Sequence, residues 1–303
     1  MNTFRAVYSD RYDVDIGAHV FPTQKYRIIR DVLLEEGVLS ERELKYPHPA
    51  SDEDILLVHS EEYVRKLKTG SLSTEEIFRL ELPYSPELVE ASYICATGTI
   101  ETAYIALDRG VGIHIGGGFH HAFSDHGEGF CVFNDVAIAI RKCIRVGKIR
   151  KAMVIDCDLH QGNGTAHIFK RDPQIFTFSI HQQNNYPFYK PSSDMDIGLD
   201  DYASDTVYLY ELQKHIPKIV ADFKPELIVY VAGADPYIND KIGNLGMTIE
   251  GLKKRDEFVL ETARNSNVAV AVVLAGGYAN NVEDTVLIHC NTIKTALQLQ
   301  REV

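Results

Sequence analysis

The sequence predicts an α/β fold in which a mainly parallel central β-sheet carries helices on both faces. From residue 111 onward, short and mainly apolar segments alternate with longer segments of helical spacing. A strand whose side chains are all apolar is buried on both faces, as strands of parallel sheets are. Strand, helix and strand in succession then indicate a sheet covered on both sides by the connecting helices.

Five segments are predicted to be buried strands of this sheet: Val111–Ile115, Ala152–Ile155, Ile175–Ile180, Leu227–Val231 and Val268–Leu274. Apolar residues recur with helical spacing in four others, which are predicted helices: Val132–Arg145, Thr206–Phe223, Ile249–Arg264 and Asp284–Leu299. The first half is richer in helices, which we predict over Gln24–Glu36, Ser60–Lys68 and Pro86–Leu107. A short strand near Phe4–Tyr8 is predicted to join the sheet.

Length and composition are those of an ordinary globular protein. The 303 residues suit one large α/β domain or two small ones. Because the chain has no internal repeat and no linker rich in Pro, Gly or Ser, we expect a single domain over residues 1–303. The net charge of -12 argues against direct nucleic-acid binding and would attract a cationic substrate, although acidic surfaces also serve solubility.

The cysteines and the absence of targeting segments indicate a soluble protein of a reducing compartment. Five cysteines are present, an odd number, and no two of them form a C-x-x-C pair. Neither a disulfide framework nor a thiolate zinc site is indicated. The first ten residues are polar, and no apolar run reaches the roughly 18 residues of a membrane span. We therefore expect a cytoplasmic protein, and the sequence leaves its oligomeric state open.

Polar residues beside glycines follow four of the predicted strands. The four segments are Gly116-Gly117-Gly118-Phe119-His120-His121, Asp156-Cys157-Asp158-Leu159-His160, Ala232-Gly233-Ala234-Asp235 and Ala275-Gly276-Gly277-Tyr278. Open parallel sheets bind ligands beyond the carboxyl ends of their strands. Glycine there lets the backbone turn sharply or approach a ligand closely. These four strand ends are therefore the predicted site.

Asp156, Asp158 and His160 alternate at one strand end, so their side chains share a face if the strand ends in extended form. Carboxylate and neutral imidazole are good zinc ligands, and Asp235 could supply a third. The alternative is a strand-end turn in which an Asp caps the next helix. A lone Asp before Pro, as Asp235 is, is also a common turn residue.

The adjacent His120 and His121 suit acid/base work, because the pKa of histidine lies close to neutral pH. If Asp158, His160 and Asp235 hold the metal, this pair is free for proton transfer. The alternatives are exposed loop histidines or further metal ligands. Tyr278 could donate a hydrogen bond to a developing oxyanion, or it could simply pack at the sheet edge. The G-x-S-x-G, H-E-x-x-H and Walker signatures are missing from the sequence.

With these motifs, the chain resembles the histone deacetylase superfamily from about Ala18 onward. The carriers of the resemblance are Phe21-Pro22, Leu56–Tyr63, Gly117–Ala122, Gly129–Asp135, Asp156–Gly164, Gly233–Asp235 and Gly276–Tyr278. The variant His160-Gln161-Gly162-Asn163-Gly164, with Ser179–Gln182 and Tyr186–Phe188, looks most like the class IV branch. The resemblance implies an arginase/deacetylase-like single domain.

Carried over residue by residue, the resemblance implies a zinc site with Asp158, His160 and Asp235 as ligands, with Fe²⁺ as an alternative metal in the cell. It implies His120 and His121 as the catalytic pair, Tyr278 as the oxyanion donor, and Asp156 and Asn163 as the partners of the two histidines. A structural K⁺ would be held by Asp156, Asp158, His160, Ser179 and Ile180. Substrate would contact Gly129, Phe130, Phe188, Gly276 and Gly277.

The implied activity is hydrolysis of an acetyl or longer fatty acyl group from acyl-lysine or a related acylated amine. Many relatives carry Asp where this chain has Asn163, and a second His where it has Gln161. Asn163 can orient His121 without adding charge, so the pKa of His121 is expected to be lower than with Asp. Three other functions stay open: an acylpolyamine amidohydrolase, a ureohydrolase with paired manganese, and a catalytically inactive module that binds acyl chains or partners.

Overall fold

The computed structural model describes residues 4–300 and contains one eight-stranded sheet in which every strand pair is parallel. The strand order is β2-β1-β3-β8-β7-β4-β5-β6. The strands are β1 Ala6–Val7, β2 Leu44–Lys45, β3 Val111–His114, β4 Ala152–Asp156, β5 Ile175–Gln182, β6 Met195–Leu199, β7 Leu227–Val231 and β8 Ala269–Val273. The predicted α/β class is thereby confirmed, with a sheet that is wholly parallel.

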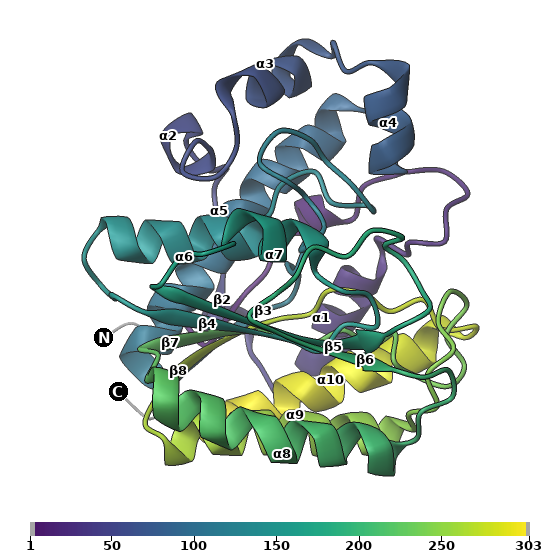
Figure 1. Ribbon diagram of the computed structural model, residues 1–303. Coiled ribbons are helices and arrows are strands. Elements are labelled where there is room, and N and C mark those ends of the chain that lie inside the picture. Colours follow the sequence, from purple (N-terminus) through teal and green to yellow (C-terminus); the bar gives the residue numbers. More distant parts are fainter. Residues whose placement is uncertain (1–3, 301–303) are drawn as a thin grey trace.

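Helices cover both faces of the sheet (Figure 1). One layer contains α5 Pro86–Arg109, α6 Asp135–Arg145 and α7 Asn163–Ile168, and the other contains α1 Lys25–Glu35, α8 Asp205–Phe223, α9 Ile249–Asn265 and α10 Val282–Leu299. The short helices α2 Asp52–Ile55, α3 Glu61–Thr69 and α4 Thr74–Leu80 lie beyond α5, away from the sheet (Figure 1). Two 3-10 turns, Asp10–Tyr12 and Glu41–Glu43, complete the elements.

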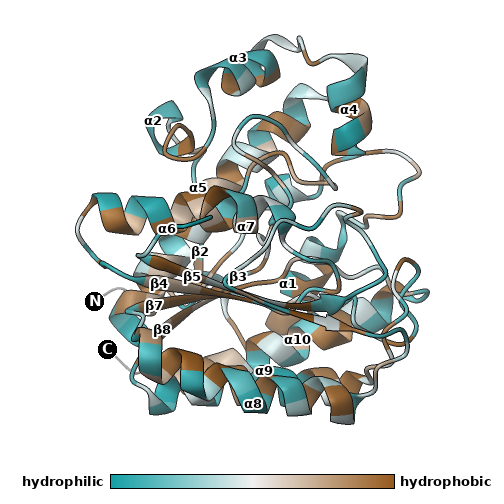
Figure 2. Ribbon diagram, in the orientation of Figure 1, coloured by the Kyte–Doolittle hydropathy of each residue, from teal (hydrophilic) through white to brown (hydrophobic). Residues whose placement is uncertain are grey.

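The distribution of apolar residues explains this layering (Figure 2). Strands β4 and β7 are buried at every position, because helices cover both of their faces. Helices α8 and α9 carry both hydrophobic and hydrophilic residues, as expected of helices with one face on a sheet and one in water (Figure 2). Within the part of the chain that the structure describes, no helix is long and apolar enough to cross a membrane.

Local sequence signals set the helix ends. The long helix α5 begins after Ser85, whose side chain accepts a hydrogen bond from the N–H of Leu88, and Pro86 occupies its first turn. It ends at Gly110, which adopts a positive φ of 82°. Helix α6 starts at Asp135 rather than at Val132, because the side chain of Asn134 caps it by accepting from the N–H of Ala137.

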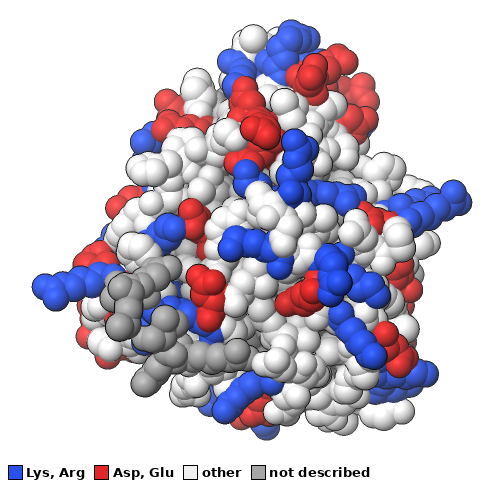
Figure 3. All heavy atoms as spheres, turned by 90° about the vertical axis from the view of Figure 1, so that its left-hand side faces the viewer, with Lys and Arg blue, Asp and Glu red and all other residues white. Residues whose placement is uncertain are grey.

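The four strands that precede the polar motifs are neighbours in the sheet. In the order β3-β8-β7-β4, their carboxyl ends lie side by side. Residues far apart in sequence therefore reach the same edge of the sheet, as the sequence predicts. On the face shown in Figure 3, basic and acidic side chains are interspersed over the residues that the structure describes.

Candidate active site

Three predicted metal ligands, Asp158, His160 and Asp235, converge at the carboxyl ends of β4 and β7. Oδ1 of Asp158 lies 3.1 Å from Nδ1 of His160, and Oδ2 of Asp235 lies 3.3 Å from the same nitrogen. Ligand atoms of a tetrahedral zinc site lie about 3.3 Å apart, because its bonds are roughly 2.0–2.1 Å long. The spacing of these three side chains therefore fits a zinc ion.

Backbone groups hold the two carboxylates in place. The N–H of Gly276 donates to Oδ2 of Asp158 at 2.9 Å, and the N–H of Leu159 donates to Oδ1 of Asp235 at 2.9 Å. A Cβ at Gly276 would lie 2.1 Å from Oδ2 of Asp235, so only glycine fits there. Oδ2 of Asp235 is buried and accepts no hydrogen bond from residues 4–300. An orphaned buried carboxylate oxygen is the expected signature of a cation ligand.

The charges of Asp158, His160 and Asp235 also favour the binding of a cation. Burial, together with the neighbouring Asp158, raises the pKa of Asp235. Burial lowers the pKa of His160, but the neighbouring carboxylates of Asp158 and Asp235 outweigh this effect and raise that pKa to about 10. With no metal bound, the proton on His160 thus supplies the positive charge that the two carboxylates need.

The tandem histidines lie next to this cluster, with ring centroids 4.1 Å apart. Nδ1 of His120 is 2.6 Å from Oδ2 of Asp156, and Nδ1 of His121 is 2.7 Å from Oδ1 of Asn163. Burial lowers the pKa of His120, but Asp156 and Asp158 raise it to about 9. Burial and the positive charges of His120 and His160 hold the pKa of His121 well below its ordinary value. One histidine is therefore a cation at neutral pH and the other a neutral base.

Tyr278 reaches the same cavity from the end of β8. Its N–H donates to Oδ2 of Asp240 at 2.8 Å, and its carbonyl accepts from the N–H of Lys241. Burial, with Asp235 and Asp158 nearby, raises the pKa of Tyr278 well above its ordinary value, so the hydroxyl stays a donor. The catalytic cavity is lined by His120, His121, Asp158, His160, Gly129, Phe130, Gly276 and Tyr278, among others.

The family model of the histone deacetylase domain matches residues 19–293. The chain belongs to the histone deacetylase domain family. Histone deacetylase 2 of Arabidopsis thaliana is 31% identical over 285 residues, which cover 90% of this chain and 74% of that protein. An uncharacterized protein of Picosynechococcus sp. is 39% identical over 287 residues, covering 94% of this chain and 96% of the relative. The family that the sequence motifs indicate is confirmed.

Two further similarities are more distant. The acetoin utilization protein AcuC of Staphylococcus aureus is 27% identical over 284 residues, which cover 86% of this chain and 73% of the relative. The crystal structure of the HDA15 HD domain matches with a TM-score of 0.80 and 22% identity, over 98% of this chain and 89% of that chain. The second match shows that the two proteins share their fold.

A second, outer cavity of about 200 Å³ shares the lining residues His121, His160 and Tyr278 with the first cavity. Its walls include Gly129, Phe130, Tyr186 and Ile242. The expectation for Phe188 needs correction, because this side chain is fully exposed and lines neither the outer nor the catalytic cavity. Tyr186 forms the wall in its place, with its ring 5.0 Å from that of His121 and at 88° to it.

The two residues at the narrow part of this route have unusual backbone conformations. Gly129 and Phe130 have φ values of 51° and 68°, and Glu128 and Cys131 pair across them as a tight turn. A Cβ at Gly129 would lie 2.9 Å from Cδ2 of His121 and from the hydroxyl of Tyr186, so glycine is required. Phe130 has a positive φ although it is not a glycine, which costs on the order of 1 kcal/mol, and its side chain lines both cavities.

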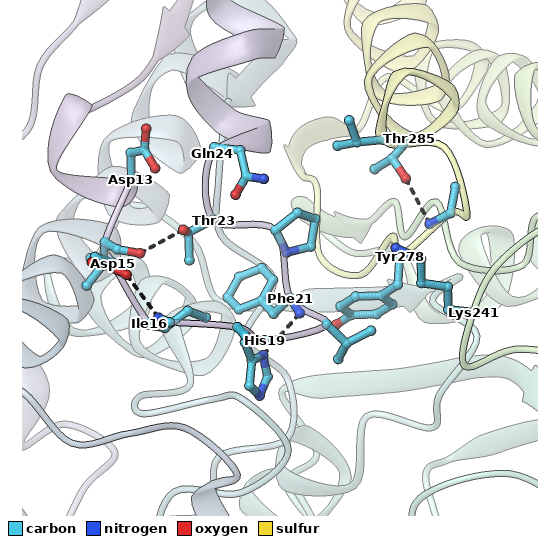
Figure 4. A pocket seen from close by; sticks show the side chains of 17 residues that line it. Asp13, Asp15, Ile16, His19, Phe21, Thr23, Gln24, Lys241, Tyr278 and Thr285 are labelled. Carbon is cyan, nitrogen blue, oxygen red and sulfur yellow. Dashed lines mark hydrogen bonds between the residues drawn. The ribbon is translucent and has the colours of Figure 1, made fainter.

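A small apolar cavity of about 40 Å³ adjoins the catalytic cavity on its inner side. The two share Phe21, Tyr26, Phe119 and Phe130 as lining residues, and Ala91 and Cys95 of α5 line the inner one. A separate pocket of about 520 Å³ lies on the other side of Tyr278 (Figure 4). There Asp13 and Asp15 face Lys241 and Thr285 across the pocket (Figure 4).

Of the five residues expected to hold potassium, Asp156, Ser179 and Ile180 lie on two neighbouring strands, and Asp158 and His160 follow the end of β4. Asp156 of β4 is paired in register with Ser179 of β5, and Ile180 follows directly. The hydroxyl of Ser179 is 2.9 Å from Nδ1 of His181. The strand pairing thus brings the side chains of Asp156 and Ser179 to one level of the sheet.

Several residues around the site were not predicted from sequence. Lys25 is fully buried, and its ammonium donates to the carbonyl of Ala275 at 2.7 Å. Asp240 holds the N–H of Tyr278, and Glu128 bonds to Asn163. Each of them is a single polar residue without a spacing pattern, so no sequence signal marks them.

A second buried cluster, Cys95, His114 and Asp135, also has metal-binding residue types. Both ring nitrogens of His114 are already hydrogen bonded, to Tyr12 at 2.8 Å and to Thr99 at 2.9 Å. Asp135 accepts from the N–H groups of Gly118 and Phe119, at 3.0 and 2.7 Å. These bonds account for the polar atoms without a metal and anchor the loop before the tandem histidines.

Proposed function

We propose that this protein is a zinc-dependent deacylase that hydrolyses the amide bond of acyl-lysine or a related acylated amine. The observation that carries the proposal is the convergence of Asp158, His160 and Asp235. Asp158 and His160 line the same cavity as His120, His121 and Tyr278. Membership of the histone deacetylase domain family supports the same reaction class. The relative named histone deacetylase 2 supports lysine as the acylated amine.

Zinc held by Asp158, His160 and Asp235 would supply Lewis-acid activation of a carbonyl and of a water molecule. His121, neutral at working pH, accepts a proton from the attacking water and later delivers it to the leaving amine. The Tyr278 hydroxyl donates to the oxyanion that develops on the carbonyl oxygen, worth roughly 3 to 4 kcal/mol. His120, paired with Asp156, keeps a positive charge beside the reaction.

The two further cavities support a separate place for each half of the substrate. The amine lies towards the outer cavity, where a lysine chain passes between Phe130 and Tyr186. The acyl group points to the inner apolar cavity behind Phe119. One water molecule needs a cavity volume of roughly 10–15 Å³. The inner cavity, with about 40 Å³, therefore holds a few groups of the size of a methylene. We therefore propose short acyl groups, from acetyl to about butyryl, with longer chains requiring the inner cavity to widen.

We also propose the finer assignments that the family membership alone does not decide. The sequence around Gln161 and Asn163 supports the class IV branch. The pairing of Asp156 with Ser179 supports a structural K⁺ there. Paired manganese is disfavoured, because such a pair needs more bridging carboxylates and this strand end carries the neutral amides Gln161 and Asn163 at two positions.

A hydrolysis screen tests the proposal. Zinc-reconstituted protein is assayed on lysine peptides and polyamines that carry acyl groups from acetyl to myristoyl, and its metal content is measured. We expect one zinc per chain and turnover of acyl-lysine. The variant Asp158→Ala should lose both zinc and turnover. Stoichiometric zinc in Asp158→Ala would refute the ligand set, and zinc-loaded protein inactive on every substrate would indicate an acyl-binding module instead.

A further inference from the structure

We propose that Glu128 is a positioning residue that fixes the Asn163 side chain and thereby sets the tautomer of the catalytic base His121. The inference rests on the proposed deacylase function, in which His121 accepts the proton of water. It adds a residue that lies outside the metal ligands and the catalytic pair.

The contacts of Asn163 define the orientation of its amide. Its Nδ2 donates to Oε1 of Glu128 at 2.6 Å, and its Oδ1 lies 2.7 Å from Nδ1 of His121. An amide oxygen can only accept a hydrogen bond, so Nδ1 of His121 must carry the proton. In the neutral ring, Nε2 then keeps the free lone pair that a general base needs.

Without Glu128, the orientation of the Asn163 amide would no longer be fixed. A flipped amide places Nδ2 against Nδ1 of His121, which favours the tautomer with the proton on Nε2. That tautomer has no lone pair at Nε2 and cannot act as the base. The flip is excluded while Glu128 is ionised, since Oδ1 would then meet a carboxylate, and both groups are acceptors.

The surroundings of Glu128 keep it ionised and in place. Oε1 also accepts from the Tyr186 hydroxyl at 3.0 Å, and Oε2 lies 3.4 Å from Nε2 of His126. Burial raises the pKa of Glu128, but hydrogen bonds from His126, Asn163 and Tyr186 outweigh it and leave that pKa below its ordinary value. The side chain is 18% exposed, so it is largely shielded from water.

The backbone around Glu128 is held as firmly as its side chain. Its N–H and C=O both bond to Cys131 across the Gly129-Phe130 turn. The N–H of Phe130 donates in turn to the carbonyl of Leu80 at the end of α4. One short turn thus presents Phe130 to the substrate route and Glu128 to the partner of the base.

Moving the carboxylate from position 128 to position 163 tests this role of Glu128 in the zinc-loaded protein. Glu128→Ala should lower kcat roughly 10- to 100-fold, with KM and zinc content little changed. Glu128→Gln keeps an acceptor oxygen and should lose less. Adding Asn163→Asp to Glu128→Ala should restore much of the lost kcat, because a carboxylate accepts from His121 in either orientation. Glu101→Ala, a glutamate of α5 paired with Lys45, is the matched control.

The same Asn163→Asp change should be harmful when Glu128 is present. Two carboxylates then meet at a hydrogen-bond distance and must share a proton, so kcat at pH 8 should fall below that of the wild type. A substitution that harms the wild type and rescues Glu128→Ala cannot be explained by loss of packing alone. Independent, multiplicative effects of the two changes would overturn the proposal, as would loss of zinc from Glu128→Ala.

A second readout does not depend on turnover. In histidine-labelled, zinc-loaded protein, nitrogen NMR should show the Nδ1–H tautomer for His121 in the wild type and a population of the Nε2–H tautomer in Glu128→Ala. An unchanged tautomer would overturn the proposal even if kcat falls. Should the wild type hydrolyse no amide at all, the proposed function fails, while the tautomer measurement still decides the role of Glu128.

Discussion

Replacing Tyr278 by Phe isolates the contribution of one hydroxyl to catalysis. The ring packs against Phe21 and Phe130, with centroids 6.3 and 6.0 Å away, and phenylalanine keeps both contacts. The backbone N–H and C=O carry the hydrogen bonds that hold this residue, and the substitution leaves them intact. Removing one oxyanion donor costs roughly 2.7–4 kcal/mol, so we expect kcat to fall about 100- to 1,000-fold.

The assay compares Tyr278→Phe with Tyr237→Phe. Tyr237 is 7% exposed and Tyr278 8%, and the Tyr237 hydroxyl bonds to Asp284 outside the catalytic cavity. Steady-state kinetics on an acyl-lysine peptide, zinc content and melting temperature are measured for both. We expect both variants to keep zinc and fold, and only Tyr278→Phe to lose turnover. Equal activities of the two variants would refute the oxyanion role of Tyr278.

Three further outcomes follow from the buried groups. Ala91→Leu should fill the inner cavity and lower kcat/KM for butyryl-lysine roughly 10-fold or more relative to kcat/KM for acetyl-lysine. If the ratio of these two values is the same as in the wild type, the acyl group does not enter this cavity. Burial lowers the pKa of His114 from 6.5 to about 3, so the unfolded state binds more protons between these values and stability falls as pH drops below 6.5. In urea unfolding, the free energy of unfolding of His114→Asn should fall less steeply with decreasing pH than that of the wild type, by about 1.4 kcal/mol per pH unit. Parallel plots of this free energy against pH for the two proteins would contradict the prediction. The pKa of His160 is about 10 without metal, so zinc binding at pH 7.5 should release close to one proton. In calorimetry, the heat of zinc binding should then depend on the ionisation enthalpy of the buffer. A heat that is the same in all buffers would contradict the prediction.

The central strands were predictable because their burial leaves a clear mark in the sequence. Leu227–Val231 was predicted to the residue, since both of its faces are covered and every side chain is apolar. Strand β6, Met195–Leu199, was missed because it lies at the edge of the sheet and alternates exposed Asp196 and Gly198 with less exposed residues. The two-residue strand β2 is too short for any periodicity to show.

The candidate metal ligands could be picked out from the sequence for a different reason. Asp158, His160 and Asp235 are chemically distinctive residues at strand ends, and the parallel topology forces those ends together. Glu128 lies 35 residues from Asn163, in a loop whose path depends on the Gly129-Phe130 turn and on contacts with α4. Phe188 fails the prediction for the same reason, because its exposure is decided by the loop and not by its apolar character.

The charges of the ligand set explain why a divalent cation and a neutral base belong together in this cavity. Two buried carboxylates and a neutral His160 would balance the charge of one divalent cation, so the proposed metal centre would be close to neutral. In the proposed reaction, His121 becomes positive when it accepts the proton of water, while the oxyanion develops negative charge beside Tyr278. Both charges arise within the same buried cavity, so its total charge does not change. A base that was already protonated could not provide this compensation, so the proposed reaction depends on the low pKa of His121 and on its contact with Asn163.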